Sequence, residues 1–393
     1  MFIRVRCKGS QVLCAALLAV LLPAVIAGCG EDNGTTSMSA PTPTATARPT
    51  PTPNSGMAVR QTDLVSDVAG AAAMDPNLVN AWGIASGPTT PFWVSDNGQG
   101  VSTLYDGAGH PAPVGQPLVV TIPPPAGSPP DTTAAPTGVV FNGTSDFVIA
   151  NGSNSGPSRF IFATEDGTLS GWNPTVNGGA AMLAADNSAS GAAYKGLALG
   201  STAAGNFLYA ANFHQARIDA FDKTFAPVEL AGSFNDPNIP AGFAPFGIQN
   251  IGGSLYVTFA KQDENKEDDS SGPGNGYVDV FDTNGNFIKR FASQGPLNSP
   301  WGLALAPATF GQFSNALLVG NFGDGRITAF NASTGAVLGQ LMTTSSTPIV
   351  IEGLWALTFG NGANAGSTNT LFFTAGPGEE AHGLFGSLQA VSG

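Results

Sequence analysis

The sequence predicts an all-β protein, a six-bladed β-propeller with about four strands in each blade. Six apolar segments, each built around a glycine, recur at intervals of 51 to 58 residues, at Gly83, Gly138, Gly196, Gly247, Gly302 and Gly353. Each is followed by further short β-prone segments and by turns rich in Gly, Asn or Asp, a pattern typical of hairpins. About two dozen strands in repeats exceed what a β-sandwich contains and indicate a propeller.

Each repeat continues with two further recognisable strands. The second strand of each unit ends at a turn, in the order FWVSDNG, FVIANG, FLYAANFH, LYVTFAKQD, LLVGNFGDG and LFFTAGPGEE. Most third strands end in an aromatic residue, in the order VSTLYD, LSGWN, RIDAFD, YVDVFD and RITAFN, with GLFGSLQAV in the sixth unit. Residues 299–341 show all four strands of one blade most clearly.

Residues 1–29 have the features of an export signal. Arg4, Arg6 and Lys8 precede an apolar run at 12–26, which is short for a membrane span. Ile26-Ala27-Gly28-Cys29 resembles a bacterial lipobox, which implies lipidation of Cys29, and the following Gly30 favours the outer membrane by analogy. An ordinary cleaved signal is the alternative. Cys29 is the last of three cysteines, so none follows it to form a disulfide or a Cys metal site.

Residues 30–58 are predicted to be a linker, and residues 59–393 the propeller. The tract PTPTATARPTPTP at 41–53 favours an extended spacer. The sixth unit has only three clear strands, whereas TDLVSDV at 62–68 alternates like a strand without a glycine anchor. We therefore expect this N-terminal strand to complete the last blade and close the ring, which removes exposed edges.

The charge balance excludes some partners. The chain has 14 Lys and Arg against 27 Asp and Glu, a net charge of −13. Nucleic-acid binding needs a basic patch, and adhesion to an anionic membrane surface needs basic clusters. We expect no nucleic-acid partner and contact with a membrane only through the lipid on Cys29, and we expect a monomer.

One end of the ring is richer in chemically able side chains. In an antiparallel blade, the connection into the first strand and the turn after the second strand lie at the same end. The residues there are Asn80, Trp82, Thr137, Tyr194, Lys195, Phe246, Trp301 and Glu352, together with Asp96, Asn97, Asn151, Asn212, His214, Lys261, Asp263, Asn321, Asp324, Glu379 and His382. Loops at one end of repeat rings usually carry binding, so this loop-rich end is predicted to meet the ligand.

The candidate ligand-binding residues at this end are Lys195, His214, Glu352, His382, Trp82 and Trp301. Lys195 and Glu352 place charge where the other repeats have neutral residues, and a charge beside a channel is costly unless paired or used. A structural Lys195–Glu352 pair is the alternative. Trp82 and Trp301 are also compatible with packing between blades, and histidines at a surface often have no catalytic or metal role.

The stretch KQDENKEDD at 261–269 is dense in carboxylates. Oxygen-rich loops suit calcium, but the spacing of an EF-hand is absent, so a solvated loop is favoured. TEDG at 164–167 is interpreted as a hairpin turn. There is no P-loop, HExxH or G-x-S-x-G motif.

Several segments together carry a family resemblance. NAWGIA, FWVSDNG, YKGLAL, GPLNSPWGLALAP and LLVGNFGDGRI resemble a family of exported bacterial propeller proteins of unassigned function. Some of those members have a PEP-CTERM sorting tail, in place of which this chain has the lipobox-like segment. The pattern of Pro-x-Gly-Ile/Leu, then a strand, then Arg-Ile-x-x-Phe is more distantly similar to NHL-repeat propellers. The resemblance implies delivery to the cell envelope or surface and supplies no catalytic residues.

Two functions from different classes follow. A surface-tethered binding or scaffold protein, recognising a protein, glycan or small molecule through the loop-rich end, is favoured. The alternative, by analogy of fold alone, is a calcium-dependent lactonase-like hydrolase with a metal in the central channel. Glu352, Asn151, Asn212 and Asn321 are the candidate ligands for that calcium. Converging oxygens in the channel would favour the enzyme, and an apolar channel would favour binding.

Overall fold

The computed structural model describes residues 56–391 of the chain. Its regular elements are β-strands and two short 3-10 helices, η1 (Ser188–Ser190) and η2 (Gly311–Phe313). The predicted signal segment, Cys29 and nearly all of the linker lie outside the described residues. Within residues 56–391, no helix has the length and apolar character needed to cross a membrane.

The strands form antiparallel sheets that follow one another along the chain. The first sheet consists of β3 (Ala81–Ala85), β4 (Phe92–Asp96), β5 (Val101–Tyr105) and β6 (Val119–Thr121). The second consists of β7 (Pro136–Phe141), β10 (Phe160–Thr164), β11 (Thr168–Trp172) and β12 (Met182–Asp186). The third consists of β13 (Tyr194–Thr202), β14 (Gly205–Asn212), β15 (Arg217–Phe221) and β16 (Pro227–Val228).

The later part of the chain repeats this arrangement. The β17 group consists of β17 (Phe243–Ile251), β18 (Ser254–Lys261), β19 (Tyr277–Asp282) and β20 (Phe287–Ser293). The β21 group consists of β21 (Pro300–Leu305), β22 (Ala316–Asn321), β23 (Ile327–Asn331) and β24 (Val337–Met342). The β25 group consists of β25 (Leu354–Phe359), β26 (Thr370–Ala375) and β27 (Leu384–Ala390), and β1 (Met57–Ser66) pairs with β27 and carries β2 (Ala73–Met74) at its edge. Each sheet is named below by its first strand in this order.

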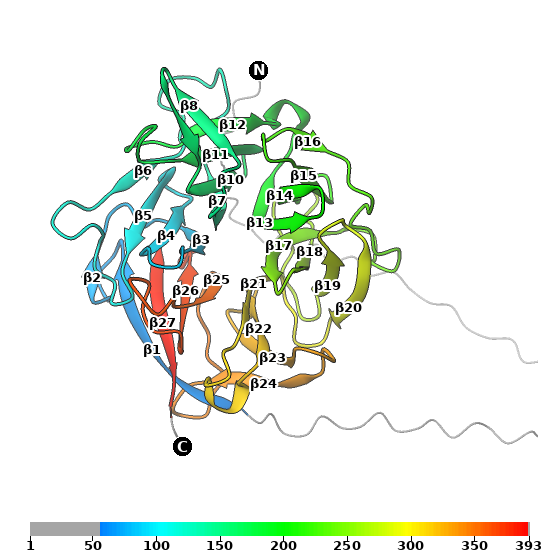
Figure 1. Ribbon diagram of the computed structural model, residues 1–393. Coiled ribbons are helices and arrows are strands. Elements are labelled where there is room, and N and C mark those ends of the chain that lie inside the picture. Colours follow the sequence, from blue (N-terminus) through cyan, green and yellow to red (C-terminus); the bar gives the residue numbers. More distant parts are fainter. Residues whose placement is uncertain (1–55, 392–393) are drawn as a thin grey trace, which may run out of the picture. The chain divides into compact units, whose positions relative to one another are not determined.

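The sheets fan outward around a common centre, with the first strand of each sheet innermost (Figure 1). These inner strands contact one another in a closed cycle: β3 contacts β7, then β13, β17, β21 and β25 follow in turn, and β25 contacts β3. Apolar side chains fill the spaces between neighbouring sheets as separate clusters. This arrangement is that of a β-propeller.

The N-terminal strand pairs with the last sheet, which confirms the predicted pairing. β1 runs antiparallel to β27 from Val59 opposite Ala390 to Ser66 opposite Leu384. It begins at Met57, earlier than the predicted 62–68, and Met57 also pairs in parallel with Leu341 of β24. The first strand of the chain therefore covers the edge of β27 and joins β21–β24 to β25–β27 in one nine-stranded sheet that also includes β2.

The glycine anchors lie where inner strands approach each other most closely. A Cβ added to Gly83 would lie 2.2 Å from the carbonyl oxygen of Thr137, and one added to Gly247 would lie 2.3 Å from that of Trp301. At Gly302 the corresponding distance to a backbone oxygen is 2.5 Å. Because backbone cannot yield as a flexible side chain does, only glycine permits this approach.

The sixth anchor was wrongly placed at Gly353. Gly302 packs against the carbonyl of Trp355, as Gly247 packs against Trp301, so the residue after Trp355, Ala356, is the sixth anchor position. Gly353 instead has a φ of 65° in the turn before β25. Trp355, rather than Glu352, therefore occupies the position that Lys195 has in the β13 sheet.

The second strand of the β7 sheet was also wrongly assigned. The stretch FVIANG forms β8 (Val148–Asn151), which pairs with β9 (Asn154–Pro157) in a separate two-stranded hairpin. The true second strand is β10, whose five residues are all buried. Three of the four residues of β8 are exposed, which distinguishes it from an inner strand. Asn151 therefore does not lie in the turn after the second strand of this sheet, on which its predicted position depended.

Candidate functional site

The site begins at a β-bulge near the start of β13. Pairing with β14 shifts register between Tyr194 and Gly196, so Lys195 is the extra residue, and bulges re-aim such side chains. The corresponding positions in the other sheets hold Trp82, Thr137, Phe246, Trp301 and Trp355. Lys195 turns toward the centre, where its Nζ lies 5.2 Å from the ring centroid of Trp82.

Aromatic side chains fill the centre of the propeller at the end that carries Lys195. Trp82 and Phe322 both stack on Trp355, with centroid distances of 3.7 and 4.0 Å. We call this group the aromatic plug: Trp82, Phe213, Phe246, Trp301, Phe322 and Trp355. The channel lined by the inner strands has a volume of only about 40 Å³, and most of its lining residues are glycine or apolar.

The ammonium of Lys195 is almost completely buried and is paired with two carboxylates. Its Nζ donates to Oε1 of Glu165 and, at 2.9 Å, to Oδ1 of Asp268. The Lys195 side chain is 2% exposed. A buried charge is tolerated when it is paired and hydrogen-bonded, and these contacts meet that condition.

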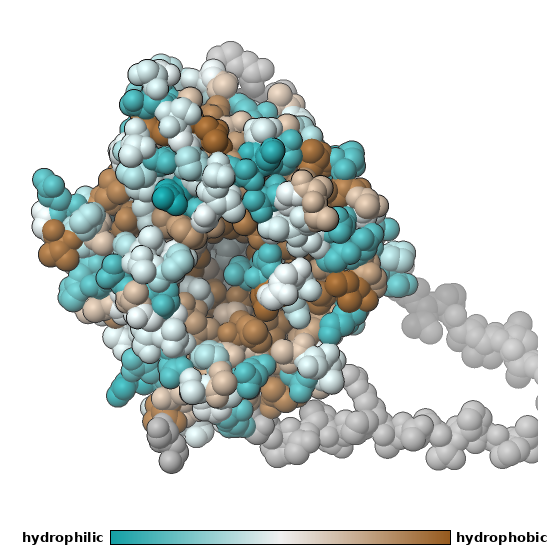
Figure 2. All heavy atoms as spheres, in the orientation of Figure 1, coloured by the Kyte–Doolittle hydropathy of each residue, from teal (hydrophilic) through white to brown (hydrophobic). Residues whose placement is uncertain are grey.

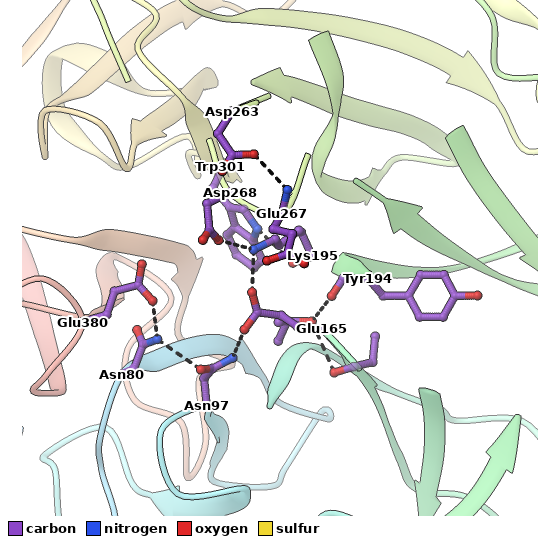
Figure 3. A network of polar contacts seen from close by, with 12 residues as sticks. Asn80, Asn97, Glu165, Tyr194, Lys195, Asp263, Glu267, Asp268, Trp301 and Glu380 are labelled. Carbon is purple, nitrogen blue, oxygen red and sulfur yellow. Dashed lines mark hydrogen bonds and ion pairs between the residues drawn. The ribbon is translucent and has the colours of Figure 1, made fainter. Parts of the chain in front are cut away.

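Hydrogen bonds continue from Glu165 across the centre (Figure 3). Nδ2 of Asn97 donates to Oε2 of Glu165 at 2.9 Å. Nδ2 of Asn80 donates to Oδ1 of Asn97 at 3.3 Å and to Oε2 of Glu380 at 2.7 Å. We call these residues together the central network: Lys195, Glu165, Asp268, Asn97, Asn80 and Glu380.

The indole of Trp355 determines the orientation of the amide groups in this network. Nε1 of Trp355 can only donate, and it lies 3.0 Å from Oδ1 of Asn80. The amide nitrogen of Asn80 must therefore face Glu380 and Asn97. Asn97 then accepts through its oxygen and turns its own amide nitrogen to Glu165, so the amide orientations support one another.

Residues from every sheet meet in this region. Asn80 and Asn97 flank β3 and β4, Glu165 follows β10, and Asp268 follows β18. Glu380 follows β26, and Trp301 of β21 donates its indole N–H to the carbonyl oxygen of Lys195 at 3.0 Å. The central network therefore ties residues of five sheets together at one end of the propeller, and the hydrogen bond from Trp301 attaches the β21 sheet to it.

A cavity of about 320 Å³ lies beside Glu380, and we call it the glutamate cavity. It is lined by Phe322, Glu352, Gly353, Gly376, Glu379 and Glu380. This volume is within the range of small-molecule sites. A hollow is visible at the centre of the molecule in Figure 2, with both hydrophilic and hydrophobic residues around it.

The backbone at one side of the glutamate cavity is strained. Gly378, Glu379 and Glu380 have φ values of 67°, 55° and 65°. The left-handed conformation costs a non-glycine residue roughly 1–2 kcal/mol. Such strain persists where surrounding structure holds it and is concentrated at functional sites.

Burial raises the pKa of Glu380 to about 7, and the nearby carboxylate of Glu165 contributes in the same direction. The carboxyl group therefore changes charge near neutral pH. Groups with perturbed pKa values that line a cleft are candidates for function. Glu380 is the residue of the central network that also lines the glutamate cavity.

Lys195 stays protonated at neutral pH. Burial alone would lower the pKa of its ammonium, but the carboxylates of Glu165 and Asp268 outweigh burial and raise it. A lysine nucleophile needs a lowered pKa, so Lys195 is not suited to forming covalent adducts. Its chemistry is that of a fixed positive charge.

The structure brings only some of the predicted ligand-binding residues together. Trp82 and Trp301 belong to the aromatic plug, and Glu352 lines the glutamate cavity, where its Oε1 accepts from the N–H of Gly378 at 3.0 Å. His382 Nδ1 lies 2.9 Å from Asp67. His214 and His382 are not among the residues of the central network or the cavity lining. Lys195 pairs with Glu165 and Asp268 rather than with Glu352, so the suggested Lys195–Glu352 pair was wrong.

The candidate calcium ligands have separate surroundings. Asn212 donates to Asp219 at 2.8 Å, and Asn321 donates to the carbonyl oxygen of Pro296 at 2.8 Å. Asn151 lies on the exposed β8–β9 hairpin. Among the residues that the structure describes, no group of three His, Cys, Asp or Glu side chains is arranged to hold a metal ion.

Sequence reasoning missed three members of the central network. Glu165 lies in TEDG, which follows β10 as the turn DNG follows β4, so correct assignment of the second strand would have placed it. Asp268 belongs to the acidic stretch interpreted as solvated, and its contact with Lys195 has no local signal. Glu380 adjoins Glu379, which was placed at this end.

Similarity to a solved structure, a glucose dehydrogenase, agrees with this fold. A glucose dehydrogenase, 11% identical, superposes with a TM-score of 0.50 and covers 84% of this chain and 100% of its own. A streptogramin B lyase, also 11% identical, covers 85% and 97%, with a TM-score of 0.43. The likeness to the glucose dehydrogenase concerns the fold alone.

The chain belongs to a family that includes uncharacterized proteins of Acanthamoeba polyphaga mimivirus. One of them is 34% identical over 325 residues, which cover 81% of this chain and 76% of that protein. A second is 35% identical over 330 residues, covering 81% and 82%. These viral relatives do not support the exported bacterial family suggested by resemblance, and no protein-family model matches the chain.

Proposed function

We propose that this protein is a six-bladed binding propeller that receives a small ligand in the glutamate cavity. The observation that carries this proposal is the position of the cavity, beside a buried polar network and an aromatic plug that together involve every sheet. The cycle of inner strands supports the count of six blades. The pocket between the inner strands is narrow, with a volume of about 40 Å³, so the glutamate cavity is the larger of these two spaces.

The charges around the cavity favour a ligand with a positively charged group. Lys195 is matched by Glu165 and Asp268, whereas Glu352, Glu379 and Glu380 all line the cavity. The lining therefore has an excess of carboxylates. Phe322 adds an aromatic ring, and a cation over such a ring gains about 0.5–2 kcal/mol. An ammonium or guanidinium group satisfies both features.

The test measures, by titration calorimetry, the binding of agmatine, a small molecule with an amine and a guanidinium. Because a cation binds the ionised carboxylate, affinity should increase as pH rises through about 7, the pKa of Glu380, and binding should release a proton. Glu380→Gln should lower the affinity roughly tenfold and flatten its dependence on pH.

The matched control is Glu229→Gln, which removes an exposed carboxylate outside the cavity lining and should leave agmatine binding unchanged. Equal effects of both substitutions, or no binding by the wild type, would contradict the proposal. Thermal stabilisation by calcium that EGTA reverses, without any effect of agmatine, would instead support the lactonase-like alternative.

We further propose that the protein is exported and tethered to the cell envelope by a lipid on Cys29, with the residues between Cys29 and β1 as a spacer, which shortens the predicted linker because β1 begins at Met57. The basic start, apolar run and Ile26-Ala27-Gly28-Cys29 support this proposal. Cys29→Ser should release the protein from membranes or leave the signal uncut, as judged by fractionation and by the mass of the product. Unchanged processing and unchanged fractionation of the variant would argue against a lipid anchor.

A further inference from the structure

The two carboxylates that bind Lys195 differ in their surroundings. The side chain of Glu165 is 15% exposed, whereas that of Asp268 is 73% exposed. Glu165 is also held by the amide of Asn97. Glu165 is therefore the inner partner of the ammonium, and Asp268 is its outer partner, on the side open to solvent.

Asp268 reaches Lys195 from the long loop that joins β18 to β19, residues 262–276. The two ends of this loop are attached to the propeller: Nε2 of Gln262 donates to the carbonyl oxygen of Phe213 at 2.6 Å, and the N–H of Gly272 donates to Oδ1 of Asn298 at 2.7 Å. Residues 264–268 between them are exposed. Within the loop, the N–H of Asp263 donates to the carbonyl oxygen of Asp268 at 2.8 Å. Movement of Asp268 away from Lys195 would therefore loosen this turn while the two ends of the loop stay attached.

One carboxylate suffices to balance the charge of Lys195. Glu165 already supplies that charge at hydrogen-bond distance, so the contact with Asp268 is not needed to neutralise the buried ammonium. Exchange of Asp268 for another carboxylate would leave the charges around Lys195 unchanged. The outer side of Lys195 is thus suited to a carboxylate supplied by another molecule.

This position lies close to the glutamate cavity. The charges of Lys195 and Asp268 both act on Glu380, and in Figure 3 Asp268, Lys195, Glu165, Asn97 and Asn80 lead in an arc to Glu380. A ligand held by its cationic group at Glu380 can therefore present a second group toward Lys195.

We propose that Asp268 is an internal substitute for a carboxylate of the ligand, which displaces it from Lys195. The ligand is then a zwitterion of the amino-acid type, with its carboxylate on Lys195 and its ammonium or guanidinium in the glutamate cavity. This inference rests on the proposed function, since it specifies the ligand of the same site. While Asp268 occupies Lys195, the apparent affinity is reduced by the fraction of molecules in that closed state.

The test compares arginine with agmatine, which lacks the carboxylate of arginine but keeps its guanidinium. In Asp268→Asn the internal competitor loses its charge, so arginine should bind roughly tenfold more tightly, whereas agmatine affinity should change less than about twofold. Glu264→Gln, which removes an exposed charge from the same loop, should leave both affinities unchanged. Titration calorimetry of the three proteins gives these values.

A second measurement reports the release of the loop without any ligand. Lys266 lies two residues before Asp268 and is exposed, so trypsin cleavage after Lys266 should be several-fold faster in Asp268→Asn than in the wild type or Glu264→Gln. Arginine should accelerate this cleavage in the wild type, and agmatine should not.

Equal affinity for arginine and agmatine in both the wild type and Asp268→Asn would overturn the inference while the proposed cation site stands. Equal cleavage rates in the three proteins would overturn it as well. If agmatine and arginine both fail to bind although Asp268→Asn is cleaved faster, the proposed function fails, and with it the assignment of the ligand.

Discussion

Deletion of residues 58–68 is expected to abolish folding of the propeller. The deleted segment includes Val59, Leu64 and Val65, which are 2%, 7% and 0% exposed. Burial of such side chains contributes about 1.5–3 kcal/mol each, so roughly 5–9 kcal/mol is lost with these three alone. A whole domain is typically stable by about 5–15 kcal/mol. The deletion also exposes the edge of β27, which favours aggregation.

The expected outcome is loss of the cooperative thermal transition, with the protein in inclusion bodies or soluble aggregates. Deletion of residues 30–55, which lie before the described residues, is the control and should leave the melting temperature unchanged. Equal tolerance of the two deletions would show that β1 does not complete the last sheet.

A permuted chain separates strand pairing from position in the sequence. Because Val59 lies opposite Ala390 in an antiparallel pair, residues 57–68 can be attached after β27 through a short Asn-Gly turn, which suits hairpins. This permutant should recover a cooperative transition that the deletion lacks. Failure to recover would indicate that the chain connection through residues 67–80 matters as well as the strand.

Lys195→Met is expected to destabilise the protein by about 3–5 kcal/mol, since removing one partner of a buried pair leaves an uncompensated charge. Lys195 is 2% exposed and Glu165 only 15%, so solvent offers little compensation. Urea unfolding should show the loss as a lower midpoint.

The double substitution Lys195→Met with Glu165→Gln tests this explanation. A neutral amide in place of Glu165 removes the unpaired charge, so most of the lost stability should return. Arginine binding should nevertheless stay weak in the double variant, because the ammonium that receives the carboxylate is absent. Recovery of both stability and arginine binding would show that Lys195 has only a structural role.

The central network thus has two consequences for this molecule. Its contacts join residues of five sheets, which stabilises this end of the ring. The same contacts position Glu380 at the cavity and keep Lys195 charged. The two substitutions above distinguish these roles, because stability responds to charge pairing whereas ligand affinity responds to which groups remain.

The sequence by itself determined the class of fold and the end of the ring that carries the network. Repeated glycines report where inner strands approach, and alternation with turn residues reports strands, because both depend on local backbone geometry. Lys195 could be predicted as a site residue because the other repeats have apolar or neutral residues at this position, so no packing or turn rule of the repeat requires a charge there. Asn80 and Asn97 were placed at the correct end by the repeat phase alone.

Only the tertiary structure decided which residues meet there. Ala356 replaces the sixth glycine and Gly353 lies nearby, so the repeat was shifted and Glu352 was assigned a position that Trp355 holds. The partners of Lys195 come from residues 30 and 73 positions away in the chain. Ion pairs between residues of different sheets depend on how the sheets are arranged around the ring. The periodicity within a strand or turn does not encode the distance between side chains of different sheets.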